Sequence, residues 1–77
     1  MDNLDRDRLC RRHGFTYRLW WDRNLEAWRA YLRSPLPGGE FSQLDAEPMP
    51  TKTQGEQWLN ERLTQELQAR SIPLPLL

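Results

Sequence analysis

The chain has 77 residues, of which 38% are hydrophobic and 29% are charged, and its formal net charge at pH 7 is zero. This composition is typical of a single small globular domain over residues 1–77 and excludes an intrinsically disordered chain. No apolar run approaches the roughly 18 residues that span a bilayer, and the charged N-terminus is not a secretory signal, so no membrane partner is expected. Cys10 is the single cysteine and cannot form an internal disulfide, which predicts a cytoplasmic protein.

Charge is unevenly distributed along the chain. Residues 1–33 hold eight arginines and five acidic residues, a net charge of +3, whereas residues 34–77 have a net charge of −3. Arginine outnumbers lysine ten to one. A GC-rich genome is the ordinary explanation of this ratio, and the use of arginine forks in stacking and bidentate contacts is the functional one.

Residues 3–13 are predicted to form a short helix. Asp2 or Asn3 can cap its N-terminus, and the basic residues in its last turn interact favourably with the helix dipole. Gly14 follows as a typical C-terminal stop. Because the segment has few apolar residues, it must dock on the rest of the chain to be stable.

Residues 15–44 are predicted to form two or three antiparallel strands. One side of the alternating runs holds Phe15, Tyr17, Leu19, Trp21, Trp28, Ala30 and Leu32, and the other holds Thr16, Arg18, Trp20, Asp22, Arg29, Tyr31 and Arg33. This period-two pattern, interrupted by turn-forming residues 22–24, predicts a hairpin. Residues 40–44 are a candidate third strand, and the proline-rich residues 45–50 are expected to be a loop.

A helix over residues 25–32 is the alternative to the second strand. Leu25, Trp28 and Leu32 have helical spacing, and the segment has good helix propensity. The hairpin is favoured because the two alternating runs support each other.

A second helix is predicted over residues 54–70. Thr53 and Glu56 fit a capping box, in which the threonine hydroxyl serves a backbone amide and the glutamate reaches back. Glu66 and Arg70 are spaced as an i,i+4 ion pair. The apolar stripe that should face the sheet consists of Trp58, Leu59, Leu63 and Leu67.

These elements define an α+β fold: a short N-terminal helix, a two- or three-stranded antiparallel sheet, and a C-terminal helix packed on the sheet. The expected core combines the helix stripe with Phe15, Tyr17, Leu19, Trp21, Trp28, Ala30 and Leu32. Residues 71–77 form an apolar, proline-punctuated tail that is expected to be extended. The tail either covers the protein's own core or docks on a partner.

The sequence offers no catalytic or metal-binding constellation. Cys10 and His13 would share one side of a helix, but no third group orients them, and a structural zinc site needs four ligands. Gly38 and Gly39 lack the lysine and the helix of a phosphate-binding loop. We therefore predict a protein that is not an enzyme and needs no cofactor or metal.

The predicted binding residues lie on the polar side of the hairpin. They are Arg18, Trp20, Arg29, Tyr31 and Arg33. Tryptophan, tyrosine and arginine dominate protein–protein hot spots, which predicts a bacterial or phage protein that regulates or inhibits a protein partner. The ordinary alternative is that the N-terminal helix and the tail cover this side.

Two other functions are consistent with the sequence. Arginines beside aromatic rings also suit single-stranded nucleic acid, although a pI of about 6.6 is low for such a protein. A small accessory subunit that docks through its C-terminal tail is the third hypothesis. Pairing of an open strand edge with a second copy, giving a homodimer, is a further option.

The middle of the chain resembles the small antitoxin-like domains of the HicB type. The matching pieces within residues 17–67 are the segments YRLWWD (17–22) and WRAYL (28–32), the loop PLPGG (35–39), and Thr53 with Glu56. The resemblance implies a β-β-β-α domain related to a partial ribonuclease-H-like fold that lacks catalysis and binds a partner protein. The family's DNA-binding part has no counterpart in this sequence.

Overall fold

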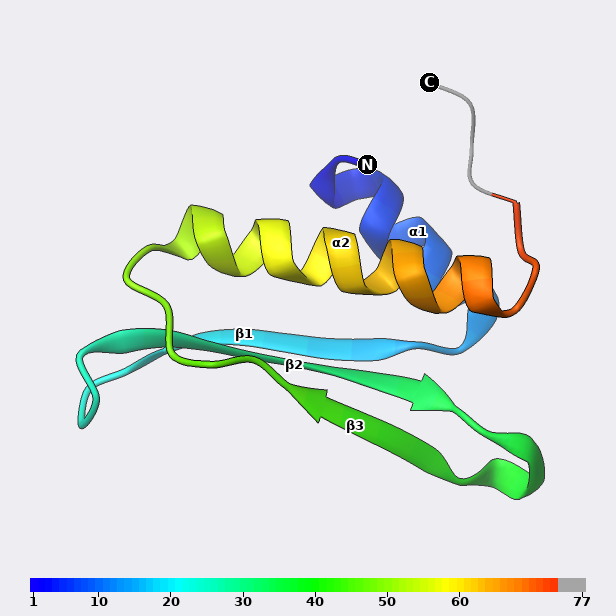
Figure 1. Ribbon diagram of the computed structural model, residues 1–77, viewed down its shortest axis with the longest axis horizontal. Coiled ribbons are helices and arrows are strands. Elements are labelled where there is room, and N and C mark those ends of the chain that lie inside the picture. Colours follow the sequence, from blue (N-terminus) through cyan, green and yellow to red (C-terminus); the bar gives the residue numbers. More distant parts are fainter. Residues whose placement is uncertain (74–77) are drawn as a thin grey trace.

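Two helices lie on one side of a three-stranded antiparallel sheet in the computed structural model, which describes residues 1–73 (Figure 1). The helices are α1 (Asn3–His13) and α2 (Lys52–Ala69), and a short 3-10 turn, η1, spans Pro37–Gly39. The strands are β1 (Thr16–Asp22), β2 (Ala27–Pro35) and β3 (Phe41–Asp45), with β2 in the centre. The predicted α+β fold, with a C-terminal helix packed on an antiparallel sheet, is confirmed.

Helix α1 has the bounds and the caps that its sequence predicts. The Asp2 carboxylate accepts a hydrogen bond from the amide of Asp5 at 2.8 Å, which satisfies one of the unpaired donors of the first turn. Gly14 ends the helix in the left-handed conformation (φ 80°), and its amide donates to the carbonyl of Cys10. A glycine is needed here because other residues rarely adopt a positive φ.

The hairpin of β1 and β2 is confirmed, and the alternative helix over residues 25–32 is wrong. Trp21 lies opposite Trp28, and Tyr17 lies opposite Leu32, so the apolar sides of both runs coincide. The Asp22 carboxylate closes the turn by accepting hydrogen bonds from two backbone amides, those of Asn24 and Leu25. Pairing with a second amphipathic strand therefore outweighs the local helix propensity.

Strand β3 completes the sheet, so the three-stranded alternative holds. Leu44 lies opposite Leu32, and Gln43 lies opposite Arg33. The chain then continues along β2, where Met49 and Trp28 exchange two backbone hydrogen bonds of 2.7 and 2.9 Å. The prediction of a loop over residues 45–50 is thus wrong at Asp45, which ends β3, and at Met49, which lies between two prolines and keeps its own amide for pairing.

Helix α2 begins two residues earlier than predicted. Its N-cap is Thr51, whose hydroxyl accepts a hydrogen bond from the amide of Gln54 at 3.1 Å. Thr53, the predicted cap, lies inside the first turn. The sequence contains two overlapping capping patterns, Thr51 to Gln54 and Thr53 to Glu56, and the helix uses the upstream one.

The core lies between the two helices and one side of the sheet. Its buried members are Leu9, Cys10, Phe15, Ala30, Leu32, Ala46, Leu59, Leu63 and Leu67, with Tyr17, Leu19, Met49 and Trp58 partly buried beside them. Gly55 lets α2 approach β1 closely, because a methyl group there would lie 2.4 Å from a methyl carbon of Leu19. Trp21 was expected in this core and is not part of it, since 46% of its surface is exposed.

A buried arginine anchors α1 to the rest of the domain. Arg6 is 5% exposed, and its guanidinium donates to the side-chain oxygens of Asn3 and Asn60, each at 3.1 Å. The same group lies 4.7 Å from the ring centroid of Tyr17, whose hydroxyl donates to Asp7. Helix α1 is therefore held to both α2 and β1 by polar contacts, which compensates for its small apolar content.

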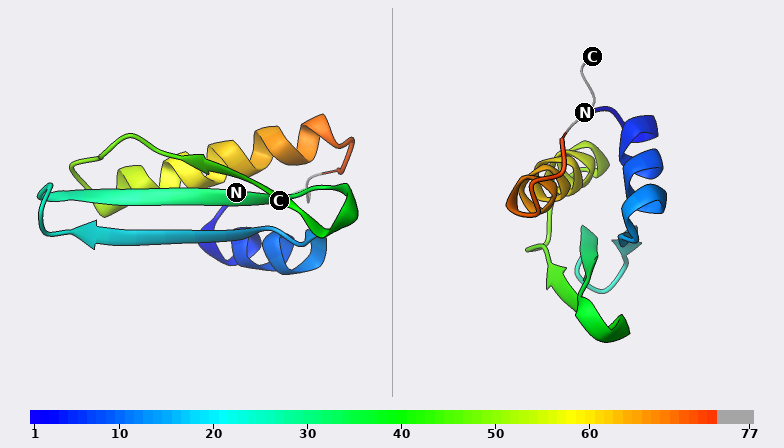
Figure 2. Two further views of the ribbon diagram at one scale, coloured as in Figure 1. Left: turned by 90° about the horizontal axis from the view of Figure 1, so that it is seen from below. Right: turned by 90° about the vertical axis from the view of Figure 1, so that its right-hand side faces the viewer.

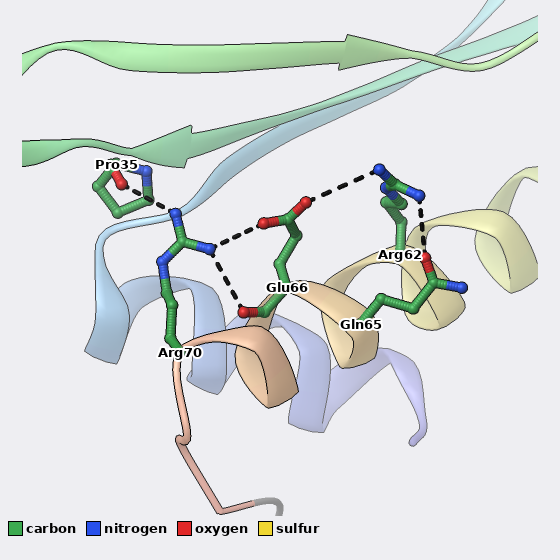
Figure 3. Close-up of polar contacts among 5 residues, drawn as sticks. All are labelled: Pro35, Arg62, Gln65, Glu66 and Arg70. Atoms are coloured by element: carbon green, nitrogen blue, oxygen red, sulfur yellow. Dashed lines mark hydrogen bonds and ion pairs between the residues drawn. The ribbon is translucent and has the colours of Figure 1, made fainter.

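Arg70 fixes the C-terminal end of α2 to the sheet (Figure 3). Its guanidinium donates to the carbonyl of Pro35 in β2 at 3.0 Å and forms an ion pair with Glu66 at 2.8 Å, as the i,i+4 spacing predicts. It also lies 5.0 Å from the ring centroid of Phe15. One side chain thus joins the end of α2 to β2 and to the start of the sheet.

The chain leaves α2 through a Schellman motif. Ser71 adopts a positive φ of 58°, the amide of Ile72 donates to the carbonyl of Leu67, and the amide of Ser71 donates to that of Gln68. Ile72 packs against the core. The prediction of an extended tail falls mostly on residues 74–77, which lie outside the described residues. In the described part of the chain, no helix has the length and apolar character needed to cross a membrane.

Replacing Ser71 by glycine is expected to raise the stability of the domain. Glycine adopts the left-handed conformation without the clash that Ser71 must tolerate, and the gain should be about 0.5–1 kcal/mol. For a domain of this size, the midpoint of thermal unfolding should rise by roughly 2–8 °C. Ser71→Ala, which keeps the unfavourable backbone conformation, is the matched control and should give no such rise.

Candidate partner-binding face

The sheet has one side without a helix, which we call the outer face. Both helices lie on the opposite side, and the view from the sheet side shows the strands in front of them (Figure 2). The residues that alternate with Tyr17, Leu19, Ala30 and Leu32 along β1 and β2 face this side, because those four point the other way, into the core. The outer-face residues that carry the candidate site are Arg18, Trp20, Arg29, Tyr31 and Arg33. These are the five residues that the sequence singles out, and the structure brings them together.

Trp20 is the centre of this set. The guanidinium carbon of Arg18 lies 4.7 Å from the centroid of its ring, and that of Arg29 lies 5.8 Å from it. Tyr31 meets the same indole edge-on, with ring centroids 6.0 Å apart and an interplanar angle of 64°. Such cation–π and edge-to-face contacts hold the side chains in defined orientations on an otherwise open surface.

Arg33 extends the set toward β3. Its guanidinium carbon lies 5.1 Å from the ring centroid of Tyr31, and its Nε donates to Gln43 Oε1 at 2.7 Å. The amide nitrogen of Gln43 donates in turn to the carboxylate of Asp45 at 2.9 Å. The outer face is therefore a connected layer that crosses all three strands.

The charges on this layer are only partly neutralised. Arg29 pairs with Asp22 at 3.5 Å, and Arg33 reaches Asp45 only through Gln43. Within residues 1–73, Arg18 has no ion-pair or hydrogen-bond partner, and its guanidinium lies over the indole of Trp20. The layer thus keeps exposed guanidinium donors whose orientation is set by the rings beneath them.

A second exposed aromatic group lies on the helix side of the sheet, next to the hairpin turn. Trp21 packs edge-on against Trp28, with ring centroids 5.8 Å apart, and the nearby Leu25 in the turn is 51% exposed. The alternating pattern gives the correct side for Trp21 but does not tell how far the helix covers that side. Its position next to the turn-forming Asp22 is the one signal that could have placed it at the uncovered end.

Cys10 is a free cysteine that is buried in the core. Burial raises the pKa of the Cys10 thiol to about 11, with a smaller opposing effect from the charge of Arg6. An activated cysteine requires the reverse, a depressed pKa and access to solvent. Burial also raises the pKa of Tyr17, which lies beside the same hollow between α1 and β1.

Cys10 is therefore expected to resist alkylation in the folded protein. Its thiolate fraction at pH 8 should be roughly a hundredfold lower than in the unfolded chain, since two pKa units separate the states. Iodoacetamide labelling followed by mass spectrometry should show slow modification of the native protein and fast modification in denaturant. Equal rates in both conditions would contradict the docking of α1 on the core.

Hollows of about 450 and 420 Å³ are found away from this layer. The larger lies beside α2 near Met1 and Asn60, and the smaller lies between α1 and the start of β1. None of the five candidate residues lines either hollow. Among residues 1–73, no three potential metal-ligating side chains converge. The candidate site is thus a surface and not a pocket.

Comparisons of the chain with protein families, with characterised proteins and with solved structures give no significant match. The resemblance to HicB-type domains therefore stays a prediction. From β1 to α2 the element order is β-β-β-α, the order that this resemblance implies.

Proposed function

We propose that this chain is a non-enzymatic protein-binding module that regulates or inhibits a partner protein through its outer face. The observation that carries the proposal is the one-sided packing of the domain. Both helices cover one side of the sheet, while the other side presents Trp20, Tyr31 and three arginines. These three residue types are enriched at the energetic centres of protein interfaces.

The organisation of the layer supports an interface. Ordering a flexible arginine on binding costs conformational entropy, and this cost is smaller where the guanidinium already rests on a ring. Arg18 and Arg33 are both exposed and both stacked in this way. An incoming partner would therefore meet side chains that are already placed for contact.

Single-stranded nucleic acid fits this layer less well. Base stacking needs an accessible ring face, but guanidinium groups lie against both Trp20 and Tyr31. We therefore place a protein partner first and make nucleic acid an outcome of the test.

Affinity capture from host cells tests the proposal, with and without nuclease. Three baits are compared: the native chain, Arg33→Glu on the outer face, and Arg23→Glu in the hairpin turn as a matched control. Both arginines are exposed, so neither reversal should unfold the domain. A stoichiometric protein that survives nuclease, is lost with Arg33→Glu and is kept with Arg23→Glu is the expected result.

Two results would contradict the proposal. Loss of every captured protein on nuclease treatment would indicate a nucleic-acid-binding protein. Capture that is equal for all three baits would show that the partner binds elsewhere, for example through the tail, as the accessory-subunit hypothesis predicts.

A further inference from the structure

The outer-face arginines form a cluster of like charge. Arg18 lies directly opposite Tyr31, so Arg29 and Arg33 are its two diagonal neighbours on the adjacent strand. Diagonal neighbours on one face of a sheet are separated by about 7–8 Å. Three arginines are thus neighbours on the outer face, and only Arg29 has a direct carboxylate partner in the part of the chain that the structure describes.

The position of a guanidinium over a ring determines which of its N–H donors a partner can reach. A guanidinium that lies over a ring covers its flat face, while its N–H donors point outward in the plane of the fork. Among residues 1–73 no acceptor engages the N–H donors of Arg18, and Arg33 uses Nε for Gln43. A fork with free in-plane donors is suited to bidentate binding of a carboxylate.

From these contacts we infer that the partner presents an acidic segment whose carboxylates bind Arg18 and Arg33, an inference that rests on the proposed protein-binding function. In an extended segment, side chains two positions apart point the same way and are separated by about 7 Å. This separation matches that of diagonal neighbours on the outer face. Acidic residues at alternate positions of an extended chain would therefore meet both arginines at once.

A binding assay with defined peptides tests this inference. The probe is a fluorescein-labelled synthetic peptide in which glutamate alternates with threonine, and the control peptide carries glutamine instead. Fluorescence anisotropy is measured with the native protein and with Arg18→Gln, Arg18→Lys and Arg23→Gln. A labelled oligothymidylate of similar length is the phosphate-bearing comparison.

The glutamate peptide should bind the native protein at least about tenfold more tightly than the glutamine peptide, the factor expected for charge-assisted hydrogen bonds. Arg18→Gln should remove this advantage, and Arg23→Gln should leave it unchanged. Arg18→Lys should restore only part of it, because lysine supplies charge without the planar fork.

The inference would be overturned if the two peptides bound equally, or if oligothymidylate bound more tightly with the same dependence on Arg18. Equal peptide binding combined with the Arg33→Glu-sensitive capture described above would overturn the acidic segment alone and leave the protein-binding function standing. Equal peptide binding together with no Arg33-dependent capture would overturn both the acidic segment and the protein-binding function.

Discussion

Replacing Leu63 by alanine is expected to lower the free energy of unfolding by about 3–5 kcal/mol. Leu63 is fully buried (0% exposed) at the centre of the stripe by which α2 packs on the sheet. The loss combines the transfer of the side chain from water with the cavity left behind. A domain of 77 residues is stable by only roughly 4–12 kcal/mol, so this variant should be near its unfolding threshold.

Urea denaturation followed by circular dichroism measures this change. Leu4→Ala is the matched control, because Leu4 is also a helical leucine but is 55% exposed. That control should change the free energy of unfolding by no more than about 0.5 kcal/mol. If both variants were destabilised equally, α2 would not pack on the sheet as described.

Replacing Trp20 by alanine should weaken binding of the captured partner by a factor of about 30 or more, the effect expected at a hot spot. The indole carries two guanidinium groups and one phenol ring, so its removal also releases Arg18, Arg29 and Tyr31 from their orientations. Stability should fall by only about 1–2 kcal/mol, because these contacts are surface contacts.

Trp21→Ala is the control for this prediction. Trp21 follows Trp20 in β1, points to the other side of the sheet and is 46% exposed. Its replacement therefore removes mainly the contact with Trp28. Its effect on stability should be similar to that of Trp20→Ala, while partner affinity, measured by isothermal titration calorimetry, should be unchanged. Equal loss of affinity in both variants would contradict the assignment of the interface to the outer face.

The alternation of side chains was sufficient to place the candidate site. A period of two assigns each residue of β1 and β2 to one side of the sheet, and the two runs agree only when they pair as a hairpin. The bounds of α1 followed equally from local chemistry, since Asp2 and Gly14 act on the helix through their own hydrogen bonds and backbone conformation. Features that depend on neighbouring residues were therefore predictable.

Features that depend on segments distant in the sequence could not be predicted from it. Whether Trp21 is buried depends on where α2 begins over the sheet, and the choice between Thr51 and Thr53 as N-cap depends on how the preceding segment pairs with β2. Arg6 resembles any surface arginine of a helix in the sequence, and its burial follows from the positions of Asn60 and Tyr17. Tertiary contacts decide such cases.

The outer-face arginines have a consequence for folding as well as for recognition. A shift of the hairpin by one residue would move every side chain of a strand to the other side of the sheet. Arg18 or Arg29 would then face the core between the helices and the sheet, where a buried guanidinium costs several kcal/mol. The arginines thus exclude the shifted pairings that the many aromatic residues of this hairpin would otherwise tolerate. Replacing these arginines by apolar residues should consequently allow alternative strand registers, although no residue of the core is changed.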